Sequence, residues 1–193
     1  IPPRDPEVLK EAGIDPSRIA ALGAQLVLEM VLVSGRFHAD PHPGNLLCQP
    51  GDGLALLDLG SVGFVSPRRQ HEFLTFILAL RSGDPGGVAD MLAAWSQSGE
   101  VARDTLLAAS ERLVARHGTG SLVLGAMMAD FFPLLRQQGL VLPPDLVLIF
   151  KAMVTMDGVL TGIAPDFDLS EALERMRGKL VASRLQRLAA PDR

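Results

Sequence analysis

The sequence predicts a mainly α-helical fold in which one small β-hairpin carries the chemically distinctive loops. Three observations support this prediction. Apolar residues recur at helical spacing over most of the chain. Helix-start signals, an Asp or Ser followed directly by Pro, occur at Asp15, Ser66 and Asp84. Residues 37–65 form one non-helical stretch, in which two brief apolar runs flank a turn containing Pro, Gly and Asp.

The N-terminal elements are predicted first. Residues 1–14 are expected to be a linker, because their three prolines disfavour regular structure. A helix is then expected from Asp15-Pro16, with apolar residues spaced three or four apart, ending at Ser34-Gly35. The main domain therefore spans residues 15–193.

The central and C-terminal elements follow from the same signals. The two strands of the hairpin are expected at residues 46–48 and 54–57. Pro133 is expected to kink or break the helix that contains it. Further helices are predicted to begin after Ser66 and Asp84 and to cover about residues 101–117, 122–138, 144–161 and 170–188.

The composition argues against several classes of function. A net charge of −4 and a pI of about 5.5 are unfavourable for binding a phosphate backbone, so no nucleic-acid partner is expected. The aromatic share of 5%, without tyrosine, is unfavourable for a site built on stacked rings. Cys48 is the single cysteine, which excludes an internal disulfide and a zinc site made of cysteines.

The mean hydropathy of +0.25 is high, and we therefore compared the apolar runs with the length of a membrane span. Glu29, Asp130 and Lys151 interrupt these runs, and none approaches the roughly 18–20 apolar residues required. A cytoplasmic location without a transmembrane span is expected. Residues 171–193 form a basic amphipathic segment, which is either packed on the helices or a peripheral contact with a membrane surface.

Polar residues suited to chemistry gather in two places, residues 37–45 (FHADPHPGN) and residues 57–63 (LDLGSVG). A hairpin returns the chain to its start, so Asp58 is expected near Asn45 and Asp40. Two carboxylates and an amide oxygen would converge there, and such oxygens suit Mg²⁺ together with phosphate groups. Gly60 and Gly63 are expected to let the backbone turn sharply after Asp58.

These spacings match a protein-kinase active site. Asp40 and Asn45 have the spacing of the Asp and Asn in the catalytic loop H-R-D-x-x-x-x-N, and Asp58 begins a D-F-G motif with Leu in place of Phe. In this interpretation His38 packs under the loop and orients it. His42 either bonds a neighbouring backbone group or contacts phosphate.

FHADPHPGNL at residues 37–46 and LLDLGSVG at residues 56–63 resemble the UbiB (ADCK-type) family of atypical protein-kinase-like proteins. The sequences MDGV at residues 156–159 and DF at residues 166–167 are also similar to that family's C-terminal lobe. The resemblance implies a kinase-like C-terminal lobe with Asp40 as the catalytic aspartate. It implies Asn45 and Asp58 as metal ligands, and Mg²⁺ and ATP as cofactors contacted by His38, His42, Asn45, Asp58 and Gly60.

The resemblance further implies ATP hydrolysis, or phosphorylation of a small molecule or lipid, in support of isoprenoid quinone (ubiquinone-type) biosynthesis. Lipids and quinone-pathway proteins are then candidate partners. The family's lysine-x-glycine-glutamine segment, alanine-rich nucleotide loop and strand lysine are not found here. Because the first residue is Ile1, we expect a lobe cut from a longer chain, lacking its N-terminal lobe and inactive alone.

Two other functions stay open. An aminoglycoside- or choline-kinase-like phosphotransferase would use a similar H-x-D-x-H-x-x-N loop, which residues 38–45 also satisfy. The paired glycines after Asp58 favour the UbiB-like interpretation. A pseudokinase scaffold that binds nucleotide without turning it over is the non-enzymatic alternative.

Overall fold

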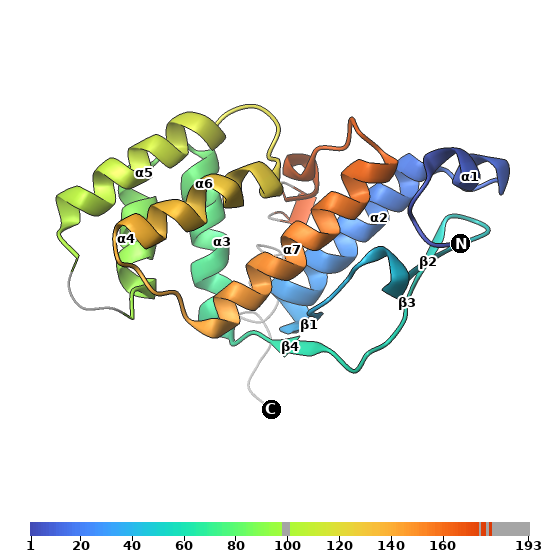
Figure 1. The fold of residues 1–193 in the computed structure, drawn as a ribbon, viewed down its shortest axis with the longest axis horizontal. Helices are drawn as coiled ribbons and strands as arrows, with labels where there is room; N and C mark the ends of the chain where they lie inside the picture. The colour runs from blue at the N-terminus through green and yellow to red at the C-terminus, as the bar shows by residue number, and fades with distance from the viewer. Residues whose placement is uncertain (98–100, 174, 177, 179–193) are drawn as a thin grey trace, which may run out of the picture.

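The computed structural model describes residues 1–97, 101–173, 175–176 and 178, and this part of the chain is mainly helical (Figure 1). The strands are β1 (Arg36–His38), β2 (Leu46–Gln49), β3 (Gly53–Leu56) and β4 (Val62–Phe64), with a 3₁₀ turn at Pro43–Asn45. The helices are α1 (Pro6–Glu11), α2 (Pro16–Glu29), α3 (Pro67–Arg81), α4 (Pro85–Trp95), α5 (Arg103–His117), α6 (Leu124–Gln137) and α7 (Pro144–Ile163). The predicted mainly α fold with a small hairpin is confirmed.

The N-terminal segment differs from its prediction, because residues 1–14 contain regular structure. Pro6 does not block a helix but occupies the first turn of α1, where its missing N–H costs nothing, and Asp5 caps that turn. Leu9 and Ile14 are buried in a small apolar cluster with Ile19, Cys48 and Ile163. The expectation of an irregular segment is therefore wrong. The domain boundary at residue 14 stays a prediction.

The strands form two separate antiparallel pairs. The predicted hairpin is β2–β3, in the register Leu46↔Leu56 and Cys48↔Leu54. A second pair, which the sequence analysis did not predict, joins β1 to β4 with Phe37 opposite Gly63. Because β1 precedes β2 and β4 follows β3, this second pair joins the segments that lead into and out of the hairpin. Both polar motifs are thereby held at one edge of the molecule.

The predicted helix starts are confirmed by side-chain caps. Asp15 accepts a hydrogen bond from the N–H of Ser17, Ser66 from that of Arg69, and Asp84 from that of Gly87. The first long helix continues beyond α2 as one π-helical turn, Met30–Ser34, and ends at Gly35, whose φ is +70°. A Cβ at Gly35 would lie 2.7 Å from the carbonyl oxygen of Val65, so this stop needs glycine.

Helix α6 continues through Pro133, so the expected break does not occur. The lost backbone hydrogen bond is compensated by packing, since Phe131 is fully buried and Leu134 and Leu135 are nearly so. The few aromatic rings meet in this region. Phe76 lies 5.0 Å from Trp95 and 5.6 Å from Phe131, measured between ring centroids.

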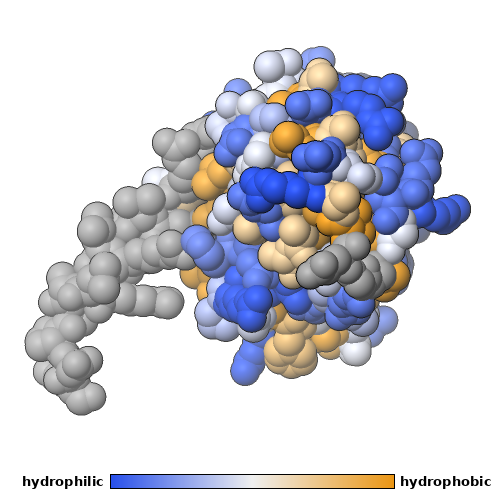
Figure 2. Space-filling model, turned by 90° about the vertical axis from the view of Figure 1, so that its left-hand side faces the viewer, coloured by the Kyte–Doolittle hydropathy of each residue, from blue (hydrophilic) through white to orange (hydrophobic). Residues whose placement is uncertain are grey.

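A buried carboxylate fixes the far end of the same core. Glu72 on α3 accepts a hydrogen bond from the indole N–H of Trp95 (3.1 Å) and pairs with Arg68 and Arg69. Arg69 also bonds Asp145 at the start of α7, 2.8 Å away. This network ties α3 to α4 and α7. The adjacent end of the molecule has a surface on which polar and apolar residues are mixed (Figure 2).

Helices α2 and α7 lie side by side and run obliquely across the molecule (Figure 1). By length and composition, Pro16–Ser34 and Pro144–Ile163 are each apolar enough to cross a membrane, although 44% and 56% of these windows are buried inside the structure. Core helices of soluble proteins pass the same test. The predicted helix at residues 170–188 and the basic segment at 171–193 lie largely outside the described residues.

Candidate active site

The loop that carries Asp40 is a tight turn between β1 and β2. Its start is held by the N–H of Ala39, which bonds the carbonyl oxygen of Ser61 beside β4 (2.9 Å). Inside the turn, the N–H of His42 bonds the Asp40 carbonyl (2.9 Å) and the N–H of Asn45 bonds the His42 carbonyl (2.8 Å). The loop is thus fixed by its own backbone rather than by packing alone.

Backbone pairing brings Asn45 next to the segment that carries Asp58. The N–H of Leu57 bonds the carbonyl oxygen of Asn45 (2.8 Å), which extends the hairpin ladder one step beyond Leu46 and Leu56. The side-chain amide N–H of Asn45 bonds the Asp40 carbonyl (3.1 Å). The amide oxygen of Asn45 is therefore the side-chain atom that can act as an acceptor or metal ligand.

His38 lies underneath the loop and is 2% exposed. Its Nδ1 accepts the backbone N–H of Asp40 (3.1 Å), so its Nε2 carries the proton and donates to the carbonyl oxygen of Leu57 (2.9 Å). Both ring nitrogens are thus used by backbone groups. The ring has no nitrogen left to contact a nucleotide, and the geometry fits the orienting role rather than direct cofactor binding.

The chain turns sharply directly after Asp58, at Leu59 and Gly60, as expected for Gly60, whereas Gly63 lies in β4. The positive φ of this segment (+52°) belongs to Asp58 and to neither Gly60 nor Gly63. Gly60 instead donates its N–H to the Asp58 carboxylate (3.4 Å). Gly63 is needed for space, because a Cβ there would lie 2.3 Å from the ring of Phe37.

The Asp40 carboxylate lies between two basic side chains. Its Oδ1 is 3.7 Å from Nζ of Lys151 on α7, and its Oδ2 is 3.9 Å from Nε2 of His42. The Nδ1 of His42 accepts the N–H of Gly44 (3.0 Å), so this histidine supports the loop and also faces Asp40. Sequence reasoning treated Lys151 only as an interruption of an apolar run. The only sequence feature that could have indicated a role for Lys151 is its positive charge in the middle of an otherwise apolar helix.

The donor set at this edge is suited to Mg²⁺ rather than to a metal held by protein alone. Within the described ranges, His, Cys, Asp and Glu form no group of three that could hold a metal ion. Asn45 and Asp58 offer one amide oxygen and one carboxylate, both reachable from solvent. Mg²⁺ commonly takes one or two such ligands and completes its shell with water and phosphate oxygens, so the residues fit a metal that arrives with phosphate.

Apolar side chains around Asp58 are turned outward. Leu59 is 65% exposed and Phe64 is 68% exposed, and Leu57 and Val62 are also open to solvent. Exposed apolar residues gathered in one place are typical of interaction surfaces.

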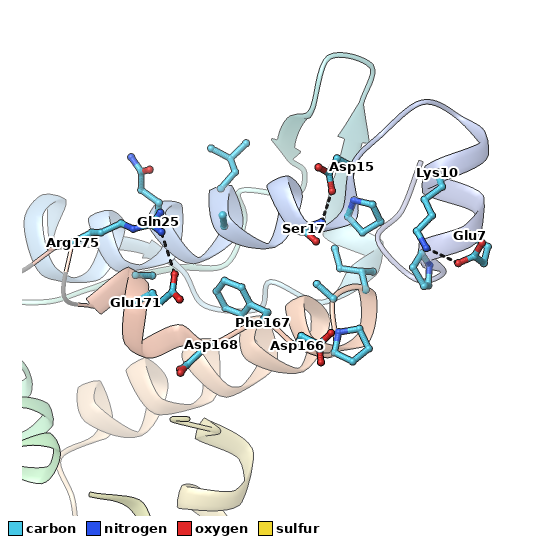
Figure 3. A pocket seen from close by; sticks show the side chains of 18 of the residues that line it. Glu7, Lys10, Asp15, Ser17, Gln25, Asp166, Phe167, Asp168, Glu171 and Arg175 are labelled. Atoms are coloured by element: carbon cyan, nitrogen blue, oxygen red, sulfur yellow. Dashed lines mark hydrogen bonds and ion pairs between the residues drawn. The ribbon is translucent and has the colours of Figure 1, made fainter. Parts of the chain in front are cut away.

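A separate pocket of about 820 Å³ lies between α1, the first half of α2 and the segment that follows α7 (Figure 3). Its lining includes Asp15, Gln25, Phe167 and Arg175. None of the residues predicted for catalysis or for cofactor binding lines it. The candidate active site is therefore an open loop edge and not this pocket.

Two family models match the chain. The ABC1 atypical kinase-like domain matches residues 1–92, which include both polar motifs, and the UbiB helical domain matches residues 119–168. Together they cover most of the sequence. The matched regions favour the UbiB-like interpretation over the aminoglycoside- or choline-kinase-like one.

Curated relatives agree with these matches. The chain is 28% identical over 180 residues to a probable protein kinase UbiB of Shewanella halifaxensis, covering 88% of this chain and 32% of the relative. It is 26% identical over 174 residues to the chloroplastic protein ACTIVITY OF BC1 COMPLEX KINASE 1 of Arabidopsis thaliana, covering 86% and 25%. The chain spans about a quarter to a third of the length of these relatives. It belongs to the UbiB/ABC1 family of atypical-kinase-like proteins.

Proposed function

We propose that this chain is the catalytic-loop side of an ATP-dependent phosphotransferase or ATPase, completed by an N-terminal lobe. In this proposal Asn45 and Asp58 bind Mg²⁺ of the magnesium nucleotide, and Asp40 positions the attacking hydroxyl or water. Bound Mg²⁺ neutralises phosphate charge, and catalysis of this kind is mostly positioning and electrostatics. The exposed side chains of Leu59 and Phe64 support a covering lobe on this face.

The observation that carries the proposal is the backbone bond between Leu57 and Asn45. This bond places Asn45 opposite Leu57, the residue directly before Asp58. The side-chain amide of Asn45 also bonds the backbone of the Asp40 loop. In this proposal the amide oxygen of Asn45 and the carboxylates of Asp40 and Asp58 act together at this edge. Resemblance to the UbiB family supports a role in isoprenoid quinone biosynthesis, with lipids or quinone-pathway proteins as partners.

The test uses the full-length polypeptide that contains this chain, with Mg²⁺-dependent ATP turnover as readout. Asp40→Asn and Asp58→Asn are each expected to lower kcat by at least about 10²-fold. Asp52→Asn is the matched control, because Asp52 lies in the same hairpin and also has a positive φ of +59°. Its carboxylate bonds Asp15 and Arg18, away from the loop.

Two results would contradict an enzymatic role. Turnover that survives Asp40→Asn unchanged would show that the loop is not catalytic. Nucleotide binding that survives Asp58→Asn, together with quinone production that also survives in a cell depending on this protein, would favour the pseudokinase scaffold.

A further inference from the structure

Lys151 is the feature of this edge that the proposed reaction has not yet used. Helix α7, all of which is described, contains three ionisable residues, and two of them have structural partners. Asp145 bonds Arg69 at 2.8 Å, and Asp157 accepts the N–H of Leu124 at the start of α6. Lys151 alone points to the catalytic loop, 111 residues after Asp40 in sequence.

The contact between Lys151 and Asp40 is poorly explained as a device for stability. The Lys151 side chain is 58% exposed and the Asp40 side chain is 42% exposed. Exposed ion pairs contribute about 0–1 kcal/mol to folding. The 3.7 Å separation is also longer than a hydrogen bond, so the ammonium group keeps hydrogens that another anion can accept.

The surface next to Lys151 has room for such an anion. Thr155, Gly158 and Gly162 continue the same face of α7 and, with Pro43 of the loop, line a shallow groove of about 340 Å³. The glycines carry no side chain, and nothing lies within 4 Å of a Cβ built on either of them. This groove begins at Thr155, one helical turn from Lys151, and the Lys151 side chain is itself 58% exposed, so its ammonium group is not enclosed by packed side chains.

We propose that Lys151 is a catalytic residue that contacts the transferred phosphoryl group, an inference that rests on the proposed function. In that reaction the acceptor oxygen bonds the γ-phosphorus while the bond from phosphorus to the β,γ-bridging oxygen breaks. The acceptor's proton goes to Asp40, and ADP leaves with the bridging oxygen. Negative charge on the phosphoryl oxygens would otherwise meet the Asp40 carboxylate, and the Lys151 ammonium offsets this repulsion.

The test compares Lys151→Met, Lys151→Arg and Lys10→Met in the full-length polypeptide. Lys10 is the matched control because it is equally exposed, at 58%, and pairs only with Glu7 among the described ion pairs. Lys151→Met is expected to lower kcat about 10²-fold, and Lys151→Arg to restore much of the loss. Lys10→Met should leave kcat unchanged.

Binding gives a second readout that a merely structural lysine would not produce. In calorimetry with Mg²⁺, Lys151→Met should weaken ATP binding about tenfold while leaving ADP binding unchanged, because only ATP carries the γ-phosphate. If Lys151→Met keeps the wild-type kcat and ATP affinity while Asp40→Asn is inactive, the role of Lys151 is overturned but the proposed function stands. An Asp40→Asn protein as active as wild type would overturn the proposed function as well.

Discussion

The imidazole Nε2 of His38 lies 2.9 Å from the carbonyl oxygen of Leu57, although 19 residues separate them in sequence. The same ring accepts the N–H of Asp40. One buried side chain therefore joins the start of the catalytic loop to the residue that precedes Asp58. The relative position of the two candidate functional carboxylates depends on this ring.

Replacing His38 with Phe keeps a ring of similar shape but removes both nitrogens. The partly buried Leu57 carbonyl and Asp40 N–H would then lose their side-chain partner, which should cost about 1–3 kcal/mol of folding free energy. Urea unfolding measures this loss, and turnover in the full-length polypeptide should fall with it. A His38→Phe protein with wild-type stability would show that these two backbone groups find other partners.

Asp58 is expected to show a conflict between stability and function. Its φ of +52° is unfavourable for a residue with a side chain, and glycine adopts it freely. Asp58→Gly should therefore raise stability by up to about 1 kcal/mol while abolishing Mg²⁺-dependent turnover. Thermal unfolding of Asp58→Gly beside Asp58→Ala separates the two effects, since Ala relieves no strain. A less stable glycine variant would mean that the bond from Gly60 to Asp58 outweighs the strain.

Gly63 is predicted to be intolerant of any side chain. A Cβ at this position would lie between 2.3 and 3.0 Å from atoms of the Phe37 ring, which is itself buried. Gly63→Ala should destabilise the protein by about 2–3 kcal/mol through overpacking. Gly158→Ala is the matched control, because its Cβ would meet nothing within 4 Å and a helical Ala should stabilise by about 0.5–1 kcal/mol. Equal effects in the two variants would contradict this explanation.

Asp157 should make stability depend on pH. Burial raises the pKa of this carboxyl above its ordinary value of 3.8, against the opposing effect of backbone hydrogen bonds from Gly125 and Leu124. Its stabilising contribution is therefore complete below pH 3.8 and is lost as the pH rises through the raised pKa of the folded state.

Two variants separate the charge of Asp157 from its capping role. Asp157→Asn keeps an acceptor for the start of α6 and should be at least as stable as wild type at pH 7, with the difference vanishing near pH 3. Asp157→Ala removes the cap and should cost about 1–2 kcal/mol at pH 3 and less at pH 7, where the buried carboxylate already destabilises the wild type. Chemical denaturation at pH 3 and pH 7 gives both differences. An Asn variant less stable than wild type at pH 7 would contradict the sign.

Much of the fold followed from local signals. Asp15, Ser66 and Asp84 cap the helices that they predicted, and the turn near Gly51 joins the predicted strands. Pro6 and Pro133 were both expected to disrupt regular structure, and both lie in helices. Pro6 starts a helix because the first turn needs no N–H from it, and Pro133 is tolerated inside α6 because its neighbours are buried. The start of α1 has the same Asp-Pro signal in the sequence, at Asp5-Pro6, whereas the tolerance of Pro133 depends on its surrounding contacts.

The sequence by itself determined the residues of the two polar motifs and the hairpin that brings them together, because both are properties of neighbouring residues. Tertiary structure alone decided which groups surround Asp40. Lys151 reaches it only because α7 packs along α2, and no local spacing encodes a contact across 111 residues. The pairing of β1 with β4 and the role of His38 as a buried link likewise depend on distant segments, whose packing is set by burial of the whole apolar core.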